Sequence, residues 1–143
     1  MASPTPAELH QQLAALGFEI FRVQGSRVVL ADRVRENLIM DSGVAAIAGD
    51  PPAVRIVFRA QALHFPGESS DALFARARAA AASAVVRGYA EVETLVVPIR
   101  DPGGGPVTLD TWYEIAYERT VAAGDLAEEL RRALALDKCV GGG

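Results

Sequence analysis

The chain has little of several residue types on which common functions depend. Of its 143 residues only one, Cys139, is a cysteine, and only two are histidines. A single cysteine can form no intramolecular disulfide and is expected to stay a thiol in a reducing compartment, which predicts a cytoplasmic protein. His10 and His64 lie far apart in the sequence, with no cysteine or histidine at metal-ligand spacing. We therefore expect no metal site.

An excess of positive charge and a long apolar run are also absent. The net charge is -4, so the chain as a whole repels phosphate backbones and anionic lipid. The longest run of small residues, 79–86, is too short to cross a bilayer and is flanked by arginines. Residues 1–6 lack the basic and apolar regions of an export signal. We expect neither nucleic acid nor a membrane among its partners, and no secretion by the usual route.

Length and composition favour one globular domain. A chain of 143 residues has the usual size of a domain with one core. Half of the residues are hydrophobic and 22% are charged, which is close to the globular average, so disorder is expected only at the ends. We predict a single domain over residues 1–143, with flexible ends at residues 1–4 and 139–143.

Helix signals occur at three places. Residues 5–8, Thr-Pro-Ala-Glu, place a capping hydroxyl before a proline and a reciprocal carboxylate, which predicts a helix that ends at Gly17. The second and longest helix is expected from the Ser-Ser-Asp cap at 69–71 to Gly88. Asp125, with a glutamate three residues later, predicts the cap of the last helix. The predicted buried faces are Leu9, Leu13 and Leu16, then Leu73, Phe74, Ala77, Ala81, Ala84 and Val85, then Leu126, Leu130 and Leu134.

Strand-forming runs separated by glycine or proline turns predict three hairpins. They span residues 18–31, residues 44–63 around the turn at 49–52, and residues 92–119 around the glycine-rich loop at 101–106. The segment 32–42 fits both a helical turn and a strand, and stays undecided. Pro98 cannot donate to a ladder, which places its strand at an edge or at a bulge. The fold class is therefore α+β, an antiparallel sheet of about five to six strands with helices packed on it.

Alternation in the second hairpin separates core from surface. The inward set is Val54, Ile56, Phe58, Ala60 and Ala62. Between these residues Arg55, Val57 and Arg59 point outwards, and Trp112 is expected on an exposed strand face. We predict that these four residues form a surface for a protein partner. Arg55 and Arg59 are expected to meet Glu114 and Glu118 as surface ion pairs, which contribute little to stability.

No motif identifies a catalytic centre. The loop at 101–106 is followed by a strand and not a helix, so it predicts a hairpin loop and not a phosphate cradle. Ser42 lacks the glycine pattern of a nucleophile elbow, and Cys139 has no histidine nearby. Glu114 and Glu118 stand about 13 Å apart along one strand, too far for the carboxylate pair of a glycosidase. We expect no catalytic residue and no cofactor, and favour a protein that is not an enzyme.

Element order, size and charge together resemble those of the class I type III secretion chaperones. The shared order is helix, strands, long helix, strands and an amphipathic C-terminal helix, along nearly the whole chain. Members of that family are cytosolic homodimers that hold an extended segment of a partner protein. The resemblance implies the same role and the same self-association here. It assigns no functional residues, because it rests on no residue motif.

Two functions follow as hypotheses. The first is a non-catalytic protein-binding or adaptor domain, chaperone-like and homodimeric, with a partner that the sequence does not identify. The alternative is a small-molecule-binding or enzymatic α+β domain with an apolar pocket. In that case Tyr113, Ile115 and Tyr117 line the pocket, and His64 or Arg100 orients the ligand.

Overall fold

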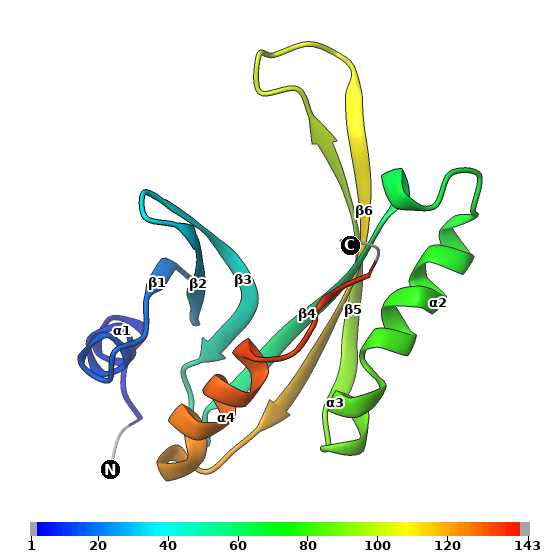
Figure 1. Ribbon diagram of the computed structural model, residues 1–143. Helices are drawn as coiled ribbons and strands as arrows, with labels where there is room; N and C mark the ends of the chain where they lie inside the picture. Colours follow the sequence, from blue (N-terminus) through cyan, green and yellow to red (C-terminus); the bar gives the residue numbers. More distant parts are fainter. Residues whose placement is uncertain (1–2, 141–143) are drawn as a thin grey trace. The chain divides into compact units, whose positions relative to one another are not determined.

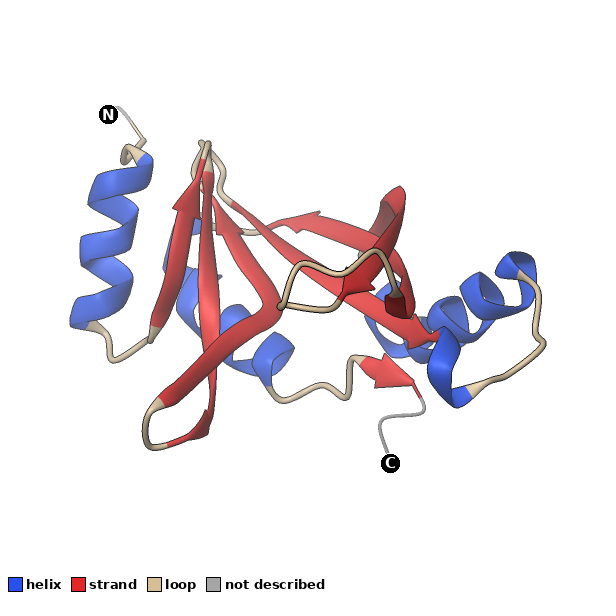
Figure 2. Cartoon of the chain, turned by 90° about the horizontal axis from the view of Figure 1, so that it is seen from above, coloured by secondary structure: helices blue, strands red, loops and turns tan. Residues whose placement is uncertain are grey.

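The computed structural model describes residues 3–140 as a sheet with helices (Figures 1 and 2). The helices are α1 (Pro6–Ala15), α2 (Ser70–Ala80), α3 (Ala82–Val86) and α4 (Leu126–Leu134), with short 3-10 turns η1 (Ala62–His64) and η2 (Ala123–Asp125). The strands are β1 (Ile20–Gln24), β2 (Arg27–Arg35), β3 (Leu38–Ile47), β4 (Ala53–Gln61), β5 (Ala90–Arg100), β6 (Thr108–Thr120) and β7 (Cys139–Val140). The α+β prediction is confirmed.

The strands hydrogen-bond in the order β1-β2-β3-β4-β6-β5, with β7 beside β4. Strands β1 to β4 form an antiparallel meander, so the first two predicted hairpins are parts of one continuous ribbon. The third hairpin, β5–β6, is confirmed. Strand β7 runs parallel to β4 and places Cys139 opposite Arg59. Residues 139 and 140 were expected in a flexible end, and in the structure they form β7. Of the other residues in the predicted flexible ends, residues 1, 2 and 141–143 lie outside the described residues.

The chain divides into two compact units. Unit 1 runs up to Ile56 and includes Glu118–Leu136, and unit 2 consists of Val57–Tyr117 and the residues from Asp137 on. Strands β4 and β6 contribute residues to both units. The expectation of one domain stays a prediction, because a division into compact units does not establish how many parts fold independently.

In unit 1, helix α1 begins at the predicted capping box. The Thr5 hydroxyl accepts a hydrogen bond from the Glu8 N–H at 3.2 Å, and the Glu8 carboxylate accepts one from the Thr5 N–H at 3.0 Å. Leu9 and Leu13 are buried, but Leu16 is 55% exposed. The prediction for Leu16 is wrong because the helix ends at Ala15, so Leu16 is the C-cap and no longer follows the helical period.

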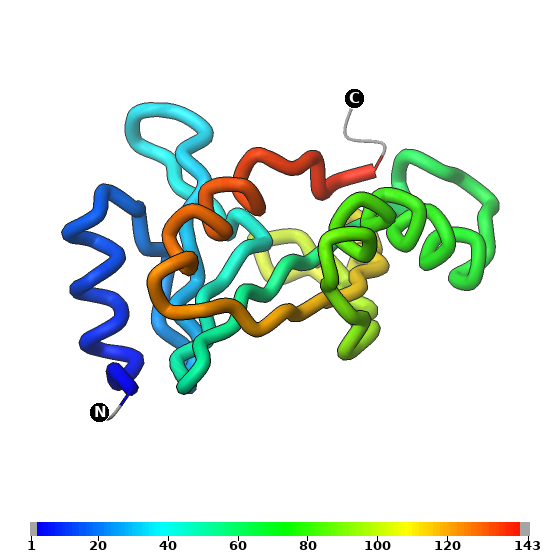
Figure 3. The backbone as a smooth tube through the Cα atoms, turned by 90° about the horizontal axis from the view of Figure 1, so that it is seen from below, coloured from blue at the N-terminus to red at the C-terminus, as the bar shows by residue number. Residues whose placement is uncertain are grey.

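The undecided segment 32–42 is the outer part of the β2–β3 hairpin. Asp32 lies opposite Met40, and Arg33 lies opposite Ile39. The turn between these strands projects from unit 1 as a free loop, drawn in cyan in Figure 3. Residues 32–41 are all exposed. Because neither face of this stretch is buried, its apolar residues need not recur at the spacing of a strand or a helix. Its sequence pattern is therefore ambiguous.

Helix α4 packs against β3 in unit 1 through the predicted apolar face. Leu126 and Leu130 are buried, and Leu134 is half-buried. The predicted side-chain cap at Asp125 is wrong, since this carboxylate makes no capping hydrogen bond. Asp125 ends the turn η2 with helical backbone angles, φ -100° and ψ -5°, whereas a capping side chain needs an extended backbone.

In unit 2, the predicted long helix is interrupted. Helix α2 begins after Ser69, whose hydroxyl accepts a hydrogen bond from the Ala72 N–H at 3.2 Å, and it ends at Ala80. Helix α3 follows one residue later. The predicted face is buried at Leu73, Ala77, Ala81 and Ala84, and Phe74 is half-buried. Val85 is 50% exposed, so its predicted burial is wrong.

The central strand β4 carries the core residues predicted for it. Val54, Ile56, Phe58 and Ala60 are each 0% exposed. Ala62 is half-buried because β4 ends at Gln61 and Ala62 begins the turn η1. At the far end of the strand path β5 has β6 as its neighbour, so the prediction that Pro98 lies in an edge strand is confirmed.

The two leucines at the end of α1 give a first test of this core. Leu13→Ala is expected to lower the free energy of unfolding by about 2–5 kcal/mol, because it leaves a cavity in a buried site. Leu16→Ala is expected to change it by about 0.5 kcal/mol or less, as is usual for an exposed position. Urea unfolding followed by circular dichroism measures both, and equal losses would contradict the position of the helix end.

Candidate functional site

A cluster of polar side chains in unit 2 joins β4 to β6. The Arg59 Nε atom donates to Glu114 Oε2 at 2.8 Å. The guanidinium carbon of Arg59 lies 3.7 Å from the ring centroid of Trp112. The Trp112 indole N–H donates to Asp110 Oδ2 at 2.9 Å. We call these four residues, Arg59, Asp110, Trp112 and Glu114, the Trp112 cluster.

Each charged group of the Trp112 cluster has a hydrogen-bond or ion-pair partner within the protein. The Glu114 side chain is 12% exposed and that of Arg59 is 26% exposed, so water weakens their attraction less than at a fully exposed pair. Stacking on the indole fixes the plane of the guanidinium. Asp110 Oδ1 also accepts from the backbone N–H groups of Leu63 at 2.8 Å and Thr111 at 2.7 Å. The cluster is therefore a rigid platform and offers no carboxylate prepared for acid or base chemistry.

A second pair, in unit 1, joins the same two strands. Arg55 donates to Glu118 Oε2 at 2.7 Å, and the side chains are 6% and 28% exposed. The predicted pairing of both arginines with the two glutamates is thus confirmed, but its description as a surface feature is wrong. Arg55 presents almost no surface to a partner. Val57, Arg59 and Trp112, the other members of the predicted partner surface, are half-buried.

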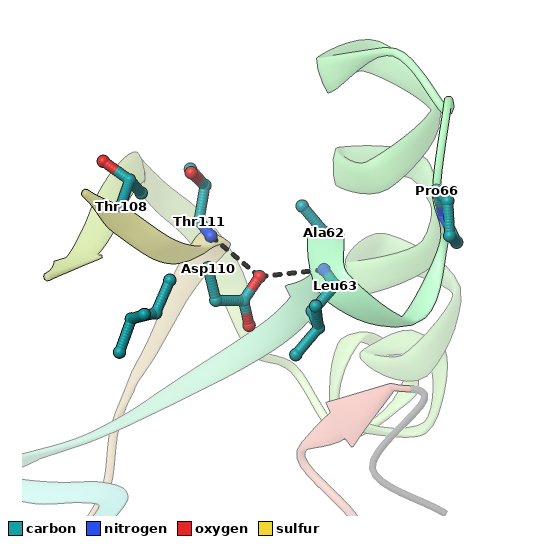
Figure 4. A pocket seen from close by; sticks show the side chains of 7 residues that line it. Ala62, Leu63, Pro66, Thr108, Asp110 and Thr111 are labelled. Atoms are coloured by element: carbon teal, nitrogen blue, oxygen red, sulfur yellow. Dashed lines mark hydrogen bonds between the residues drawn. The ribbon is translucent and has the colours of Figure 1, made fainter. Parts of the chain in front are cut away.

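A pocket of about 310 Å³ lies in unit 2 beside the turn η1 and the first residues of β6 (Figure 4). Its lining consists of Ala62, Leu63, Pro66, Thr108, Leu109, Asp110 and Thr111. The Asp110 carboxylate points to the Leu63 and Thr111 N–H groups, as the dashed lines in Figure 4 show. Leu63 is 65% exposed and Leu109 is 51% exposed. The accessible part of the pocket is therefore mainly apolar.

The residues predicted for a ligand pocket do not line this one. His64 and Arg100 are exposed. Tyr113, Ile115 and Tyr117 alternate along β6 as expected. However, Ile115 is 0% exposed and Tyr117 is 3% exposed. The space on this face is filled by two phenylalanines, which meet Tyr117 and Tyr113 edge to face at 5.7 Å and 5.3 Å between ring centroids.

The sequence pattern did not single out the residues that line the pocket. Leu63 and Asp110 are 47 residues apart, and the hydrogen bond that joins them arises only when η1 lies beside β6. The nearest signals in the sequence were the leucines at positions 63 and 109. Both are exposed, but a single exposed leucine is common on protein surfaces.

Within residues 3–140, no three His, Cys, Asp or Glu side chains come close enough together to hold a metal ion. Over the same residues, every buried side-chain nitrogen and oxygen has a hydrogen-bond partner. The helices in this part of the chain are too short or too polar to span a membrane.

Cys139 lies on β7 and is half-buried. Burial raises the pKa of its thiol, an effect that Arg59 partly opposes. The thiolate is the reactive form of cysteine, and a raised pKa makes it scarcer at neutral pH. This environment is unlike that of a catalytic nucleophile.

No family model matches the chain, and no curated protein or solved structure is significantly similar to it.

The buried pair in unit 1 gives a stability prediction. Arg55→Gln is expected to lower the free energy of unfolding by about 3 kcal/mol, because removing one partner of a buried pair leaves the other unpaired. The matched control is Arg132→Gln, whose partner Glu128 lies one helical turn away with side chains 54% and 67% exposed. That change is expected to cost about 0.5 kcal/mol. Urea unfolding of both variants measures the contrast, and similar losses would show that burial does not strengthen the Arg55 pair.

The Cys139 environment gives a reactivity prediction. In the folded protein at pH 8 the thiol is expected to react with Ellman's reagent more slowly than free cysteine, because of its raised pKa and partial burial. In urea the rate should rise to that of an unfolded chain. A folded thiol that reacts faster than free cysteine would contradict the direction of the pKa shift.

Proposed function

We propose that this chain is a non-catalytic protein-binding domain that holds an extended apolar segment of a partner protein. The supporting observation is an apolar strip on the face of the unit 2 sheet that points away from α2. Extended segments are commonly bound along sheets, where the backbone contributes affinity and side-chain sites contribute specificity. The argument begins with the two faces of the β5–β6 hairpin.

Contacts with α2 identify the covered face. Arg78 of α2 donates from Nε and Nη2 to the two Glu91 oxygens of β5 at 2.9 Å and 3.2 Å. The hydrogen bond from Arg78 lowers the pKa of Glu91, so this carboxylate stays charged. Phe74 of α2 packs on Tyr113 of β6. Odd-numbered residues of both strands therefore face α2, and even-numbered residues lie on the opposite face.

The opposite face carries the apolar strip. Val92 is 49% exposed and Val96 is 56% exposed, and Thr94 between them is also exposed. Trp112 lies on the same face of β6, held by Arg59 and Asp110. We call Val92, Thr94, Val96 and Trp112 the open face. Exposed apolar side chains beside a rigid aromatic residue are typical of protein-binding surfaces.

The pairing of charges supports binding over catalysis. The ion pair between Arg59 and Glu114 and the hydrogen bond from Trp112 to Asp110 hold the side chains of the Trp112 cluster in place. The open face is apolar, and apolar contact is what an extended segment with alternating side chains supplies. In this proposal Trp112 and Val57 remain parts of the partner surface, Arg59 acts by orienting Trp112, and the buried Arg55 acts only through its ion pair.

The chaperone-like role, the homodimer and the cytoplasmic location belong to the same proposal. Their support is the resemblance in element order, size and charge to class I type III secretion chaperones, together with a single thiol suited to a reducing compartment.

The pocket in Figure 4 supports the alternative of a small-molecule-binding domain. Its volume of about 310 Å³ is at the lower end of the range for ligand sites. A thermal-shift screen with metabolites separates the two functions, because a ligand that binds the native state raises the melting temperature by mass action. A stabilising ligand whose effect is lost in Leu109→Lys would favour this alternative.

Selection of peptides from a displayed library tests the protein-binding function. Peptides with alternating apolar residues are expected to bind, and Val96→Lys is expected to weaken them about tenfold or more, since it places a charge in the apolar strip. The control is Val34→Lys, which changes an equally exposed valine in unit 1 and should leave binding unchanged. Equal weakening by both variants, or a library that gives no binder, would overturn the proposal.

A further inference from the structure

The outer edge of β5 is an open row of backbone groups. Among the described strands β5 ends the hydrogen-bonded path, with β6 as its neighbour. It is 11 residues long, and none of its residues is buried. An exposed edge of this length pairs with another strand unless charge, proline or a covering segment prevents it. The chemistry of the edge therefore decides what it accepts.

Pro98 indicates which residues carry the open groups. In an antiparallel strand the N–H and C=O of one residue point to the same side, and those of the next residue point to the other side. Pro98 has no N–H, so it disturbs the β5–β6 ladder least when its nitrogen faces outwards. By alternation, the N–H groups of Val92, Thr94 and Val96 then face outwards too. These three donors form the free edge.

This edge is suited to an identical edge in a second copy. When a twofold axis joins two antiparallel copies in one sheet, equivalent residues keep the same face, so one residue lies opposite itself. Centring the joint on Thr94 places Val92 opposite Val96 of the second copy, and all three donors of each copy meet acceptors. Pro98 then falls at the end of the joint. A joint centred on Val96 would instead place Pro98 inside the ladder.

The side chains of the Thr94-centred joint are also compatible. Val92 and Val96 form a β-branched pair twice, and the two Thr94 hydroxyls face each other, which are both favourable cross-strand combinations. Glu93 lies opposite Leu95 of the second copy, and the two Glu93 carboxylates are diagonal neighbours at about 7–8 Å, which is the least favourable contact of this register.

No opposite charges meet across this joint. Glu91 and Glu93 lie on the odd-numbered face of β5 and Arg100 on the even-numbered face, and Glu91 already pairs with Arg78 of α2. The joint therefore depends on the backbone donors and on the valine and threonine pairs, and not on ion pairs between the two copies.

We propose that β5 pairs antiparallel with β5 of a second copy of this chain, in the register centred on Thr94. This inference specifies the self-association included in the proposed function and rests on it. The two open faces then become one continuous sheet face, with Val92 and Val96 of both copies side by side. The apolar strip for an extended segment is lengthened across the joint.

Cysteine cross-linking of the full chain tests the joint in a Cys139→Ser background. Thr94→Cys places the two thiols on a hydrogen-bonded pair with Cα atoms about 5.5 Å apart, which suits a disulfide. The matched control is Val96→Cys, whose two copies lie about 13 Å apart along the joint. On mild oxidation Thr94→Cys is expected to give a covalent dimer and Val96→Cys to give none. The combination Val92→Cys with Val96→Cys should cross-link again.

Light scattering on the unmodified chain accompanies the cross-linking. We expect a molar mass twice that of a single chain. Thr94→Pro removes the central outward donor and should give a monomer with an unchanged circular dichroism spectrum. A monomer at all accessible concentrations would overturn the joint, and so would a dimer in which Val96→Cys cross-links as readily as Thr94→Cys. If the protein is a monomer and still binds peptides, the joint is overturned and the protein-binding function is supported. If Thr94→Cys gives the covalent dimer but no peptide binds, the joint is supported and the protein-binding function is overturned.

Discussion

The alternation of side chains along β4 and β6 is the constraint on which the structure depends. One face of these strands is apolar and closes the core, with Ile56, Phe58 and Ile115 fully buried. The other face carries arginines on β4 and glutamates on β6. Their ion pairs, at 2.7 Å in each unit, satisfy charges that would otherwise be costly to cover. Both faces can therefore be removed from water.

This constraint also limits the chemistry. A carboxylate that holds a buried arginine, or accepts three hydrogen bonds as Asp110 does, is committed to structure. In unit 2 the valines of the open face are exposed, and β5 ends the described strand path. Unpaired surfaces of these two kinds are suited to association with other chains. The proposed function and the β5 joint both follow from the same residue pattern.

Local signals predicted the fold wherever one residue acts through its own backbone. The capping box at Thr5, the Ser69 cap and the edge position of Pro98 are confirmed for this reason. Errors occurred at element ends. Leu16 and Val85 continue an apolar pattern past the point where the helix or its packing stops, and Asp125 has cap chemistry with the wrong backbone conformation. Residues 32–41 are all exposed, so no alternation between buried and exposed positions marks their sequence.

The sequence by itself determined the α+β class, the caps at Thr5 and Ser69, and which side chains of β4 enter the apolar core, because these depend on neighbours a few residues away. Tertiary structure decided the strand order, the place of β7, and the partners of each charge. Arg55 and Glu118 are 63 residues apart, and only the pairing of β4 with β6 brings them together and buries them. The candidate pocket arose in the same way, from two segments that carry no shared local signal.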